Sequence, residues 1–573
     1  MTSDRISSLP TQDSIIVDSV YIQPDIRRGR ITVLLAAPGD CSFRLELPEF
    51  DVSKEGAVGK NVLPMDGFEL WTPETPKVYE LCVTTTRPGG ESETLSYSFG
   101  MREFSVKENR FFFNNRPLFV KGADCSGLVG GGVSSDDDRS AIDGCLGGLK
   151  DAGFNLIRVA LSSLTPQLLG TADGLGLLVE VRVGSADELP AISQLRNHPS
   201  VVCWNVLGIA DLDATGLRGL DPSRLFLYTN REEGCACCVR PYRDDHQRIE
   251  SIEIAHRAPT DPRSRSYCQY AGDASMLSYV SGLDVGGAEI AESRFSEYDE
   301  GLSARELERI LPAGEGVQGH VRQMGVVTAC GLVDALRANV KIAGYCVRVV
   351  GDGGREASSV SEAVNRIGVL RGLAPNQAAA RPLLAIAHTN LIPRQETPVT
   401  VHFLNEAKVE GRADLSLQVV GPTNQVLWKK KRGVRLPKSG KLLWEGSIAA
   451  SGSTGKHRFV VRVMQDMKCI AEASEDFFVY APVTKWEGVI HLLDPGKRWG
   501  EECARLVSGQ EFTAPVHVIP PISNSIREYP DNDLAQVLGR VNEGAVALFF
   551  SPPSDWNDFA SFIDPELCAT PLP

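Results

Sequence analysis

The hydrophobic pattern of the chain changes twice, and these changes constrain the fold more than any other feature. Over residues 1–104, apolar and polar residues alternate in short runs that are separated by Gly, Pro and Asp turn residues. Such alternation is typical of strands with one buried face, and a series of short strands predicts an immunoglobulin-like β-sandwich. The expected strands are Ser14–Tyr21, Arg30–Ala36, Cys41–Leu47, Val78–Thr86 and Thr94–Gly100.

Residues 105–378 have a different pattern, in which short apolar runs alternate with helical segments. Strand–helix alternation over this length predicts parallel strands that close into a (β/α)8 TIM barrel. The expected strands are Leu118–Gly122, Leu156–Val159, Leu177–Val181, Val201–Leu207, Leu225–Tyr228 and Lys341–Val350, and the expected helices include Ser140–Ala152 and Ser303–Leu311.

The alternating pattern returns between residues 381 and 480, which predicts a second β-sandwich. Residues 481–573 mix strand and helix patterns and predict a partial α/β domain, and the sequence leaves open whether that domain is complete. The fold class is therefore multidomain β and α/β. The expected strands are Val399–Phe403, Leu415–Val420 and Arg458–Met464 in the sandwich, with Gly488–Leu493 and Ala545–Phe550 around a helix at Glu501–Val507 in the last domain.

The charge and hydropathy of the chain argue against two classes of partner. The 573 residues carry 59 Lys and Arg against 73 Asp and Glu, a formal net charge of −14. An acidic chain without a long basic block lacks the electrostatic footprint of nucleic-acid binding. No run of 18 apolar residues is present, so no membrane-spanning helix is expected. The amino-terminal residues lack the basic start and apolar core of a signal peptide, so a cytoplasmic location is expected.

The 14 cysteines are scattered along the chain and do not follow the spacing of a disulfide framework. Most are expected to be buried, reduced thiols that pack as small hydrophobes. The one cluster, Cys235–Cys238, has no second ligand pair at the spacing of a zinc site. Neither a metal nor another cofactor is therefore expected.

Eight short segments of the chain stand out as motifs. They are Leu70–Leu81 (LWTPETPKVYEL), Phe99–Phe104 (FGMREF), Phe113–Gly122 (FNNRPLFVKG), Gly153–Arg158 (GFNLIR), Ala172–Val179 (ADGLGLLV), Arg196–Trp204 (RNHPSVVCW), Asp221–Arg224 (DPSR) and Arg294–Tyr298 (RFSEY). In order and spacing they resemble motifs of glycoside hydrolase family 2, which contains β-galactosidases, β-glucuronidases and β-mannosidases. The resemblance implies a retaining β-glycosidase scaffold, and the final α/β segment is faintly similar to the amidotransferase-like domains of some β-galactosidases.

The resemblance also implies positions for an active site. A retaining glycosidase needs two carboxyl groups about 5–5.5 Å apart, one as nucleophile and one as acid/base. The family's nucleophile position falls on Glu297, with Tyr298 beside it. Substrate-binding positions fall on Arg158, Trp204 and Tyr345. From the residues alone, the favoured interpretations are that Arg158 braces the barrel interior through charge-assisted hydrogen bonds and that Trp204 packs in the core.

The acid/base position departs from the family pattern. The Asn-Glu pair that follows the tryptophan of the fourth strand falls on Gly208 and Ile209, and a shift of one residue gives Ile209 and Ala210. Asp211 or Asp213 could supply a substitute acid from the following loop. The resemblance therefore implies a glycosidase that is impaired or inactive. The alternatives are a carbohydrate-binding pseudoenzyme and a structural or assembly scaffold.

The altered pocket leads to one further expectation. A lone Glu297 carboxylate in a drier pocket is costly unless it is paired. We therefore expect Arg182 or Arg348, which fall at former pocket positions, to lie within ion-pair distance of it.

The expected binding partners of the chain are carbohydrate, and other protein subunits or a second copy of the chain.

Overall fold

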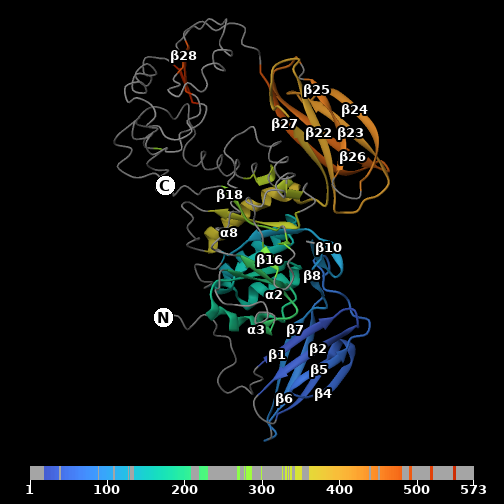
Figure 1. The fold of residues 1–573 in the computed structure, drawn as a ribbon, viewed down its shortest axis with the longest axis vertical. Helices are drawn as coiled ribbons and strands as arrows, with labels where there is room; N and C mark the ends of the chain where they lie inside the picture. Colours follow the sequence, from blue (N-terminus) through green and yellow to red (C-terminus); the bar gives the residue numbers. More distant parts are fainter. Residues whose placement is uncertain are drawn as a thin grey trace.

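The computed structural model describes three well-defined regions that follow one another along the long axis of the molecule (Figure 1). A first sandwich lies at one end, a parallel sheet with helices lies in the middle, and a second sandwich follows. The described residues are 19–37, 41–87, 89–107, 110–126, 128, 135–207, 219–229, 268–270, 276–277, 279–286, 299, 326, 329–331, 333–334, 336–337, 342–350, 360–437, 441–449, 452–480, 490–492, 516–519 and 546–549.

The first region is a β-sandwich, as the alternating pattern predicts. Its two sheets pack around a core that includes Ile31, Phe43 and Leu81. Two strands of weaker alternation, β4 and β5, were not predicted. One sheet contains β1 (Ser19–Asp25), β2 (Arg30–Ala36) and β5 (Gly59–Pro64); the other contains β4 (Val52–Gly56), β3 (Ser42–Leu47), β6 (Tyr79–Thr86) and β7 (Ser92–Phe99), with a 3-10 turn η1 at Pro48–Phe50.

A small antiparallel sheet links this sandwich to the middle region. It consists of β8 (Phe104–Lys107), β9 (Arg110–Phe113) and β10 (Arg116–Leu118). The turn between β9 and β10 has two residues with positive φ, Asn114 at 48° and Asn115 at 62°, as tight hairpins require. The phenylalanines of β8 and β9 pack against Leu156 and Leu178 of the parallel strands.

The middle region is a mostly parallel sheet of nine strands in the order β17-β16-β15-β14-β13-β12-β11-β19-β18. The seven strands from β15 to β18 in that order are parallel, whereas β16 pairs antiparallel with β15, and β17 pairs antiparallel with β16. Eight parallel strands in a closed ring were expected; the described residues form seven, without closure. The strands are β11 (Val120–Asp124), β12 (Leu156–Ala160), β13 (Leu178–Val183), β14 (Val201–Leu207), β15 (Leu225–Thr229), β16 (Cys268–Tyr270), β17 (Met276–Leu277), β18 (Tyr279–Gly286) and β19 (Gly344–Val350).

Helices cover one face of this sheet. Ile142 and Leu149 of α1, for example, pack with Ile157 and Val181 in one buried layer. Helix α1 begins four residues before the predicted start because Ser135 and Asp138 form a capping box. The helical elements are α1 (Asp136–Asp151), η2 (Leu161–Ser163), α2 (Pro166–Leu175), η3 (Ala186–Ala191), α3 (Ile192–Leu195), α8 (Val360–Gly368), η7 (Val369–Leu373) and α9 (Ala374–Gln377).

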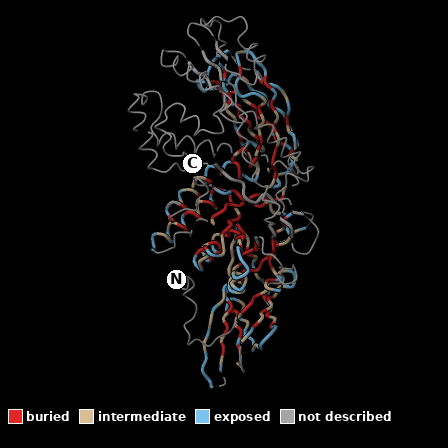
Figure 2. Tube along the Cα trace, turned by 60° about the vertical axis from the view of Figure 1, so that its left-hand side comes forward, coloured by how far each residue is buried: buried red, intermediate tan, exposed pale blue. Residues whose placement is uncertain are grey.

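The second sandwich has one continuous core between its two sheets. The buried residues of these strands are red in Figure 2. The three strands predicted here are confirmed, and five others were missed. One sheet contains β20 (Ala380–Ile386), β22 (Glu396–Asn405) and β25 (Lys441–Ala449); the other contains β21 (Asn390–Leu391), β27 (Lys468–Val479), β26 (Gly455–Gln465), β23 (Arg412–Val420) and β24 (Val426–Arg435).

Buried ion pairs join the second sandwich to the middle region. Glu406, directly after β22, accepts from Lys121 Nζ at 2.8 Å and from Arg337 Nη2 at 2.8 Å. The Lys121 and Arg337 side chains are 8% and 0% exposed. Because breaking a buried ion pair is costly, this contact fixes how the two regions meet.

The carboxyl-terminal region contributes a parallel sheet of β28 (Ile490–Leu492), β29 (Val516–Ile519) and β30 (Val546–Phe549). The two strands predicted there are confirmed, and the expected helix at Glu501–Val507 lies outside the described residues, as does Ser303–Leu311. In the described part of the chain, no helix is long and apolar enough to cross a membrane.

Candidate active site

The interior face of the parallel sheet carries a cluster of buried charged residues near the carboxyl ends of its strands. Arg158 Nε donates to Glu180 Oε1 at 2.8 Å, and Arg158 Nη1 lies 3.7 Å from Asp124 Oδ2. Asn205 Nδ2 donates to the same Glu180 oxygen at 2.6 Å. We call Asp124, Arg158, Glu180 and Asn205 the Arg158 cluster.

The strand register explains why these side chains meet. Asp124 of β11 pairs with Arg158 of β12, which pairs with Glu180 of β13. Residues in register on neighbouring strands project to the same face. Asn205 of β14 pairs with Arg182, two residues beyond Glu180, so it reaches Glu180 from the adjacent pair.

Burial determines what this cluster can do. The side chains of Asp124, Arg158 and Glu180 are 3%, 4% and 0% exposed. One guanidinium therefore lies between two carboxylates in the protein interior. Charged groups at such depth are stable only when they are paired and hydrogen-bonded. This position matches the bracing role of Arg158 that the sequence offered as one interpretation.

Polar groups continue beyond the cluster toward the end of the sheet. Ser126 N donates to Asp124 Oδ1 at 3.0 Å, and the buried Ser126 Oγ has no hydrogen-bond partner among the described residues. Arg182 and Arg348 lie two residues beyond Glu180 and Cys346 on their strands, so they project from the same face. Arg348 is exposed, and Arg182 is partly buried.

Trp204 and Tyr345 lie on the opposite face of the sheet. Trp204 pairs with Val181, and both belong to the buried layer between the sheet and the helices. Trp204 is 0% exposed, and its Nε1 donates to Asp221 Oδ2 at 3.1 Å. No face of its indole ring meets solvent, so this position differs from the substrate-binding role that the sequence implied and matches core packing.

Tyr345 is similarly enclosed near the amino end of β19. It pairs with Lys121 in the register, is 0% exposed and donates its hydroxyl hydrogen bond to Gln377 Oε1. Burial raises the pKa of the Tyr345 hydroxyl well above its ordinary value. The tyrosine therefore lies far along the strand from the carboxyl ends, away from the position of a substrate contact in a parallel barrel.

Several residues of the implied site lie outside the described residues. They include Glu297, Tyr298, Gly208, Ile209, Asp211 and Asp213, as well as the cysteine cluster at Cys235–Cys238. The expected ion pair of Glu297 with Arg182 or Arg348 therefore stays a prediction, because Glu297 is not among the described residues. The strand beside β19, β18, ends at Gly286, before Glu297 in the sequence. Among the described residues, no group of three or more His, Cys, Asp or Glu could hold a metal ion.

The buried cysteines behave as packing residues. Cys125, Cys145, Cys203 and Cys346 are buried in the middle region. Burial raises the pKa of Cys145 to about 11 and that of Cys125 well above its usual value. Both groups therefore remain neutral thiols, which are poor nucleophiles and poor metal ligands.

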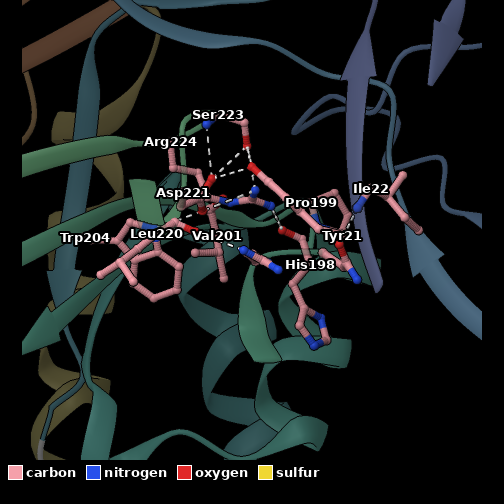
Figure 3. A network of polar contacts seen from close by, with 12 residues as sticks. Tyr21, Ile22, His198, Pro199, Val201, Trp204, Leu220, Asp221, Ser223 and Arg224 are labelled. Carbon is pink, nitrogen blue, oxygen red and sulfur yellow. Dashed lines mark hydrogen bonds and ion pairs between the residues drawn. The ribbon is translucent and has the colours of Figure 1, made fainter. Parts of the chain in front are cut away.

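A second buried network joins the first sandwich to the amino ends of β14 and β15 (Figure 3). Tyr21 of β1 donates its hydroxyl hydrogen bond to Asp221 Oδ1 at 2.6 Å. Asp221 Oδ2 accepts from Trp204 and lies 3.4 Å from Arg224 Nη1. Ser223 N also donates to Asp221 Oδ1, at 3.1 Å. We call these five residues the Asp221 network.

The pKa shifts of Asp221 and Tyr21 show how the buried charge of Asp221 is compensated. Burial alone would raise the pKa of Asp221, but Arg224 and the donors Tyr21 and Trp204 lower it below its usual value. Burial and the nearby Asp221 carboxylate raise the pKa of Tyr21. The network thus holds an ionised aspartate and a neutral phenol.

The segment Arg196–Ser200 extends the same interface. Asn197 Nδ2 donates to Val20 O at 2.8 Å, and Ile22 N donates to Asn197 Oδ1 at 2.9 Å. The Arg196 guanidinium lies 4.1 Å from the centre of the Tyr21 ring. Asn197 therefore has a structural role, because its amide group bonds to the backbone of β1 on both sides of Tyr21.

Other family-like motifs meet at this junction. Trp71 Nε1 donates to Asp173 O at 3.0 Å, and Arg102 Nε donates to Pro199 O at 3.0 Å. Gly100 lies so close that a Cβ there would be 2.7 Å from Pro199 Cβ and 2.9 Å from Trp71 Cβ. Burial, together with neighbouring Arg224, lowers the pKa of Arg102 to about 9.

Sequence reasoning missed the partners of Arg158 and of Asp221. Asp124 and Glu180 were not singled out, although a signal existed: each is a carboxylate in a short strand that is otherwise apolar except for one cation, Lys121 in β11 and Arg182 in β13. Such residues need a partner of opposite charge. Tyr21 carried no comparable signal, because its partner Asp221 lies 200 residues away.

Comparison with known proteins supports the resemblance that the motifs indicated. A sequence model of the family described as Glycosyl hydrolases family 2 matches residues 16–102. A putative β-glucuronidase of Formosa agariphila is 26% identical over 163 residues, which make up 24% of this chain and 19% of that protein. β-Galactosidase 2 of Enterobacter cloacae is 26% identical over 168 residues, 25% of this chain and 16% of that protein. The matches thus span about a fifth or less of these relatives.

The fold is similar to that of a solved structure. The β-D-mannosidase of Dictyoglomus thermophilum superposes with a TM-score of 0.55 at 13% sequence identity, covering 83% of this chain and 68% of that chain. The family match over the first sandwich thus supports the resemblance to glycoside hydrolase family 2 that the motifs indicated, and the structural likeness shows a shared fold.

Proposed function

We propose that this chain binds carbohydrate as a relative of the retaining β-glycosidases, with hydrolysis of O-glycosyl bonds impaired or lost. The parallel sheet would form part of a closed (β/α)8 barrel, and the sugar would bind at the carboxyl ends of its strands. Glu297 takes the nucleophile position in this proposal, with Tyr298 beside it. The buried thiols favour a reducing compartment and hence the cytoplasm.

The Arg158 cluster is the observation that carries the proposal. Retaining hydrolysis needs one carboxylate that is free to attack and one carboxylic acid that can donate a proton. Asp124 and Glu180 suit neither role, because Arg158 contacts both of them in the interior. A catalytic pair must then come from other residues, and the family's acid position carries Gly208 and Ile209.

A structural or assembly scaffold is the second candidate. It is favoured by the Asp221 network and its surroundings, where family-like motifs join the first sandwich to the sheet. In a scaffold, only these contacts would need to keep the family pattern. Its partners would be other protein subunits or a second copy of the chain.

An azide-rescue assay tests the proposal. Aryl β-galactosides, β-glucuronides and β-mannosides are offered to the full chain with and without added azide, because a good leaving group needs no acid. We expect slow turnover that azide accelerates, and loss of that rescue in Glu297→Gln. The matched control is Glu55→Gln, an exposed carboxylate of the first sandwich, which should leave the rescue unchanged.

The other outcomes separate the alternatives. Binding of oligosaccharide without any turnover would select the carbohydrate-binding pseudoenzyme. Absence of both binding and turnover would favour the scaffold. Efficient hydrolysis of natural β-linked disaccharides would contradict the proposal, because it would require a working acid.

A further inference from the structure

Strand β24 of the second sandwich carries a dense run of cations. Its five cations are Lys429, Lys430, Lys431, Arg432 and Arg435, and every one of them is exposed. In a chain with a formal net charge of −14, this run is a local exception. The sequence alone does not show where these residues lie in the fold. Four consecutive cations are too few to indicate a binding region.

The position of β24 displays these cations in several directions. β24 is the edge strand of its sheet and pairs with β23. Lys429 and Lys431 lie opposite Gln418 and Ser416, whereas Lys430 lies opposite the core residue Leu417. Alternating side chains therefore place cations on both faces of an exposed edge.

These cations differ from the other basic residues of the same sandwich. On β26, Lys456 and Arg458 both pair with Asp476, and Arg462 pairs with Glu472. The five β24 cations form no ion pair with a carboxylate of the residues that the structure describes. Their charges are thus available to a ligand, whereas those of β26 are neutralised within the sheet.

A partly exposed indole and exposed aliphatic side chains lie next to this run. Trp428 is partly buried and lies 6.5 Å, centre to centre, from the core residue Trp444 of β25, which is 4% exposed. Lys430 Nζ lies 5.8 Å from the centre of the Trp444 ring. Close by in sequence, Val426 and Leu442 are exposed by 52% and 48%. Cations beside exposed aliphatic side chains and one partly exposed indole suit a ligand that carries anionic groups on rings with apolar faces.

We propose that the edge formed by β24 and the adjoining part of β25 binds an acidic polysaccharide, whose carboxylate or sulfate groups contact the β24 cations. A polysaccharide is favoured over a nucleic acid because nucleic acids carry the denser charge and would be repelled more strongly by the acidic remainder of the chain. The proposal does not depend on hydrolysis at the parallel sheet, because the two sites are on different domains.

Protection of the edge is the competing explanation for the lysines. Charged residues on an edge strand prevent strand pairing between molecules. That role requires charge but no ligand. It predicts that removing the cations promotes self-association and leaves polysaccharide binding unaffected.

The experiment measures binding of polygalacturonate to the full chain by isothermal titration calorimetry, with neutral dextran and duplex DNA as parallel probes. The test variant is Lys429→Gln/Lys431→Gln/Arg432→Gln. The matched control, Lys60→Gln/Arg116→Gln/Lys468→Gln, removes the same number of exposed cations elsewhere. Sedimentation and thermal unfolding check the assembly and fold of each variant, and the three single β24 variants replace the triple one if it unfolds.

We expect wild type and control to bind polygalacturonate with affinities within about twofold, and the β24 variant to bind roughly tenfold or more weakly, a loss of about 1.4 kcal/mol or more. Added salt should weaken wild-type binding, because screening reduces attraction between exposed charges. Dextran should not bind.

Four results would overturn the proposal. These are no binding of polygalacturonate by wild type, equal loss in test and control variants, tighter binding of DNA than of polygalacturonate, and self-association of the β24 variant with unchanged binding. None of them bears on azide rescue with aryl monosaccharides, so failure of this proposal and failure of the proposed function can be distinguished.

Discussion

The Asp221 network and the Arg158 cluster are two buried polar groups on one parallel sheet, and they differ in the ratio of carboxylates to guanidinium groups. In the Asp221 network, one carboxylate has a guanidinium, a phenol and an indole as partners. In the Arg158 cluster, one guanidinium has two carboxylates, with Asn205 as an additional donor. Among the residues that define each group, the first has one carboxylate and one guanidinium and connects two domains, whereas the second has two carboxylates and one guanidinium and lies within one domain.

This difference follows from position on the sheet. The Asp221 network lies at the amino ends of β14 and β15, the end that serves stability in parallel barrels. The Arg158 cluster lies nearer the carboxyl ends, where such barrels bind ligands. Contacts of Trp71, Arg102, Asn197 and Asp221, which belong to the family-like segments, gather at the first end.

Replacing the guanidinium of the cluster should have the largest effect on stability. Arg158→Met leaves two buried carboxylates without their cation, and breaking a buried ion pair in this way costs about 4 kcal/mol. Urea unfolding followed by circular dichroism measures the change. The control Arg44→Met removes an exposed ion pair with Glu55, which should cost less than about 1 kcal/mol. Equal effects of the two substitutions would show that the cluster is not held by Arg158.

Removing the carboxylate charge of the Asp221 network should have a somewhat smaller effect. Asp221→Asn keeps one acceptor oxygen but leaves Arg224 without its counter-ion and Trp204 without its acceptor, at a cost of about 3 kcal/mol. The same unfolding measurement applies, with exposed Asp187→Asn as the control. A loss below about 1 kcal/mol would contradict the importance of this network for the domain contact.

The two networks were not equally predictable from sequence. The strand Val201–Leu207 was predicted with its observed bounds, because a short apolar run stands between clear turn signals. The position of Trp204 on the face of the sheet opposite Arg158 could not be derived, because it depends on the register between strands. A register irregularity between Val179 and Glu180 shifts the pairing of β13 with β14, and no local pattern reveals it.

Contacts between distant segments were the least predictable part. The Asp221 network needs Tyr21 from the first sandwich, and Glu406 comes from the second sandwich to meet Lys121. Hydrophobic periodicity identifies the elements but not which polar residues face each other across a domain junction. The setting of the β24 cations could not be predicted from the sequence either. Their exposure depends on β24 being the edge strand of its sheet.

The pH dependence of stability should distinguish the Asp221 network further. The folded-state pKa of Asp221 is below its ordinary value, so its stabilisation is present above the ordinary aspartate pKa of about 3.9 and is lost as the pH falls through the folded value. The difference in unfolding free energy between wild type and Asp221→Asn should therefore shrink from pH 7 toward pH 2. Unfolding curves at several pH values measure it, and a constant difference would contradict an ionised Asp221.

The smallest effect is expected at the edge of the Arg158 cluster. Ser126→Ala removes a buried hydroxyl that has no partner among the described residues, so the free energy of unfolding should change by less than about 1 kcal/mol. Asn205, a member of the Arg158 cluster, donates to Glu180, and Asn205→Ala should cost more. A large loss in Ser126→Ala would show that its hydroxyl has a structural partner.

The dependence of the hydrolysis rate on the leaving group tests the central claim most directly. The measurement is kcat/KM of the full chain for a series of aryl and alkyl β-glycosides whose leaving groups differ in acidity. Without an acid at Gly208–Ile209, the rate should fall steeply as the leaving group becomes poorer, by about 10²–10⁴ between an activated aryl and an ordinary alkyl glycoside. A flat dependence, with alkyl glycosides hydrolysed as fast as aryl ones, would contradict the account, because it would demonstrate a functioning proton donor.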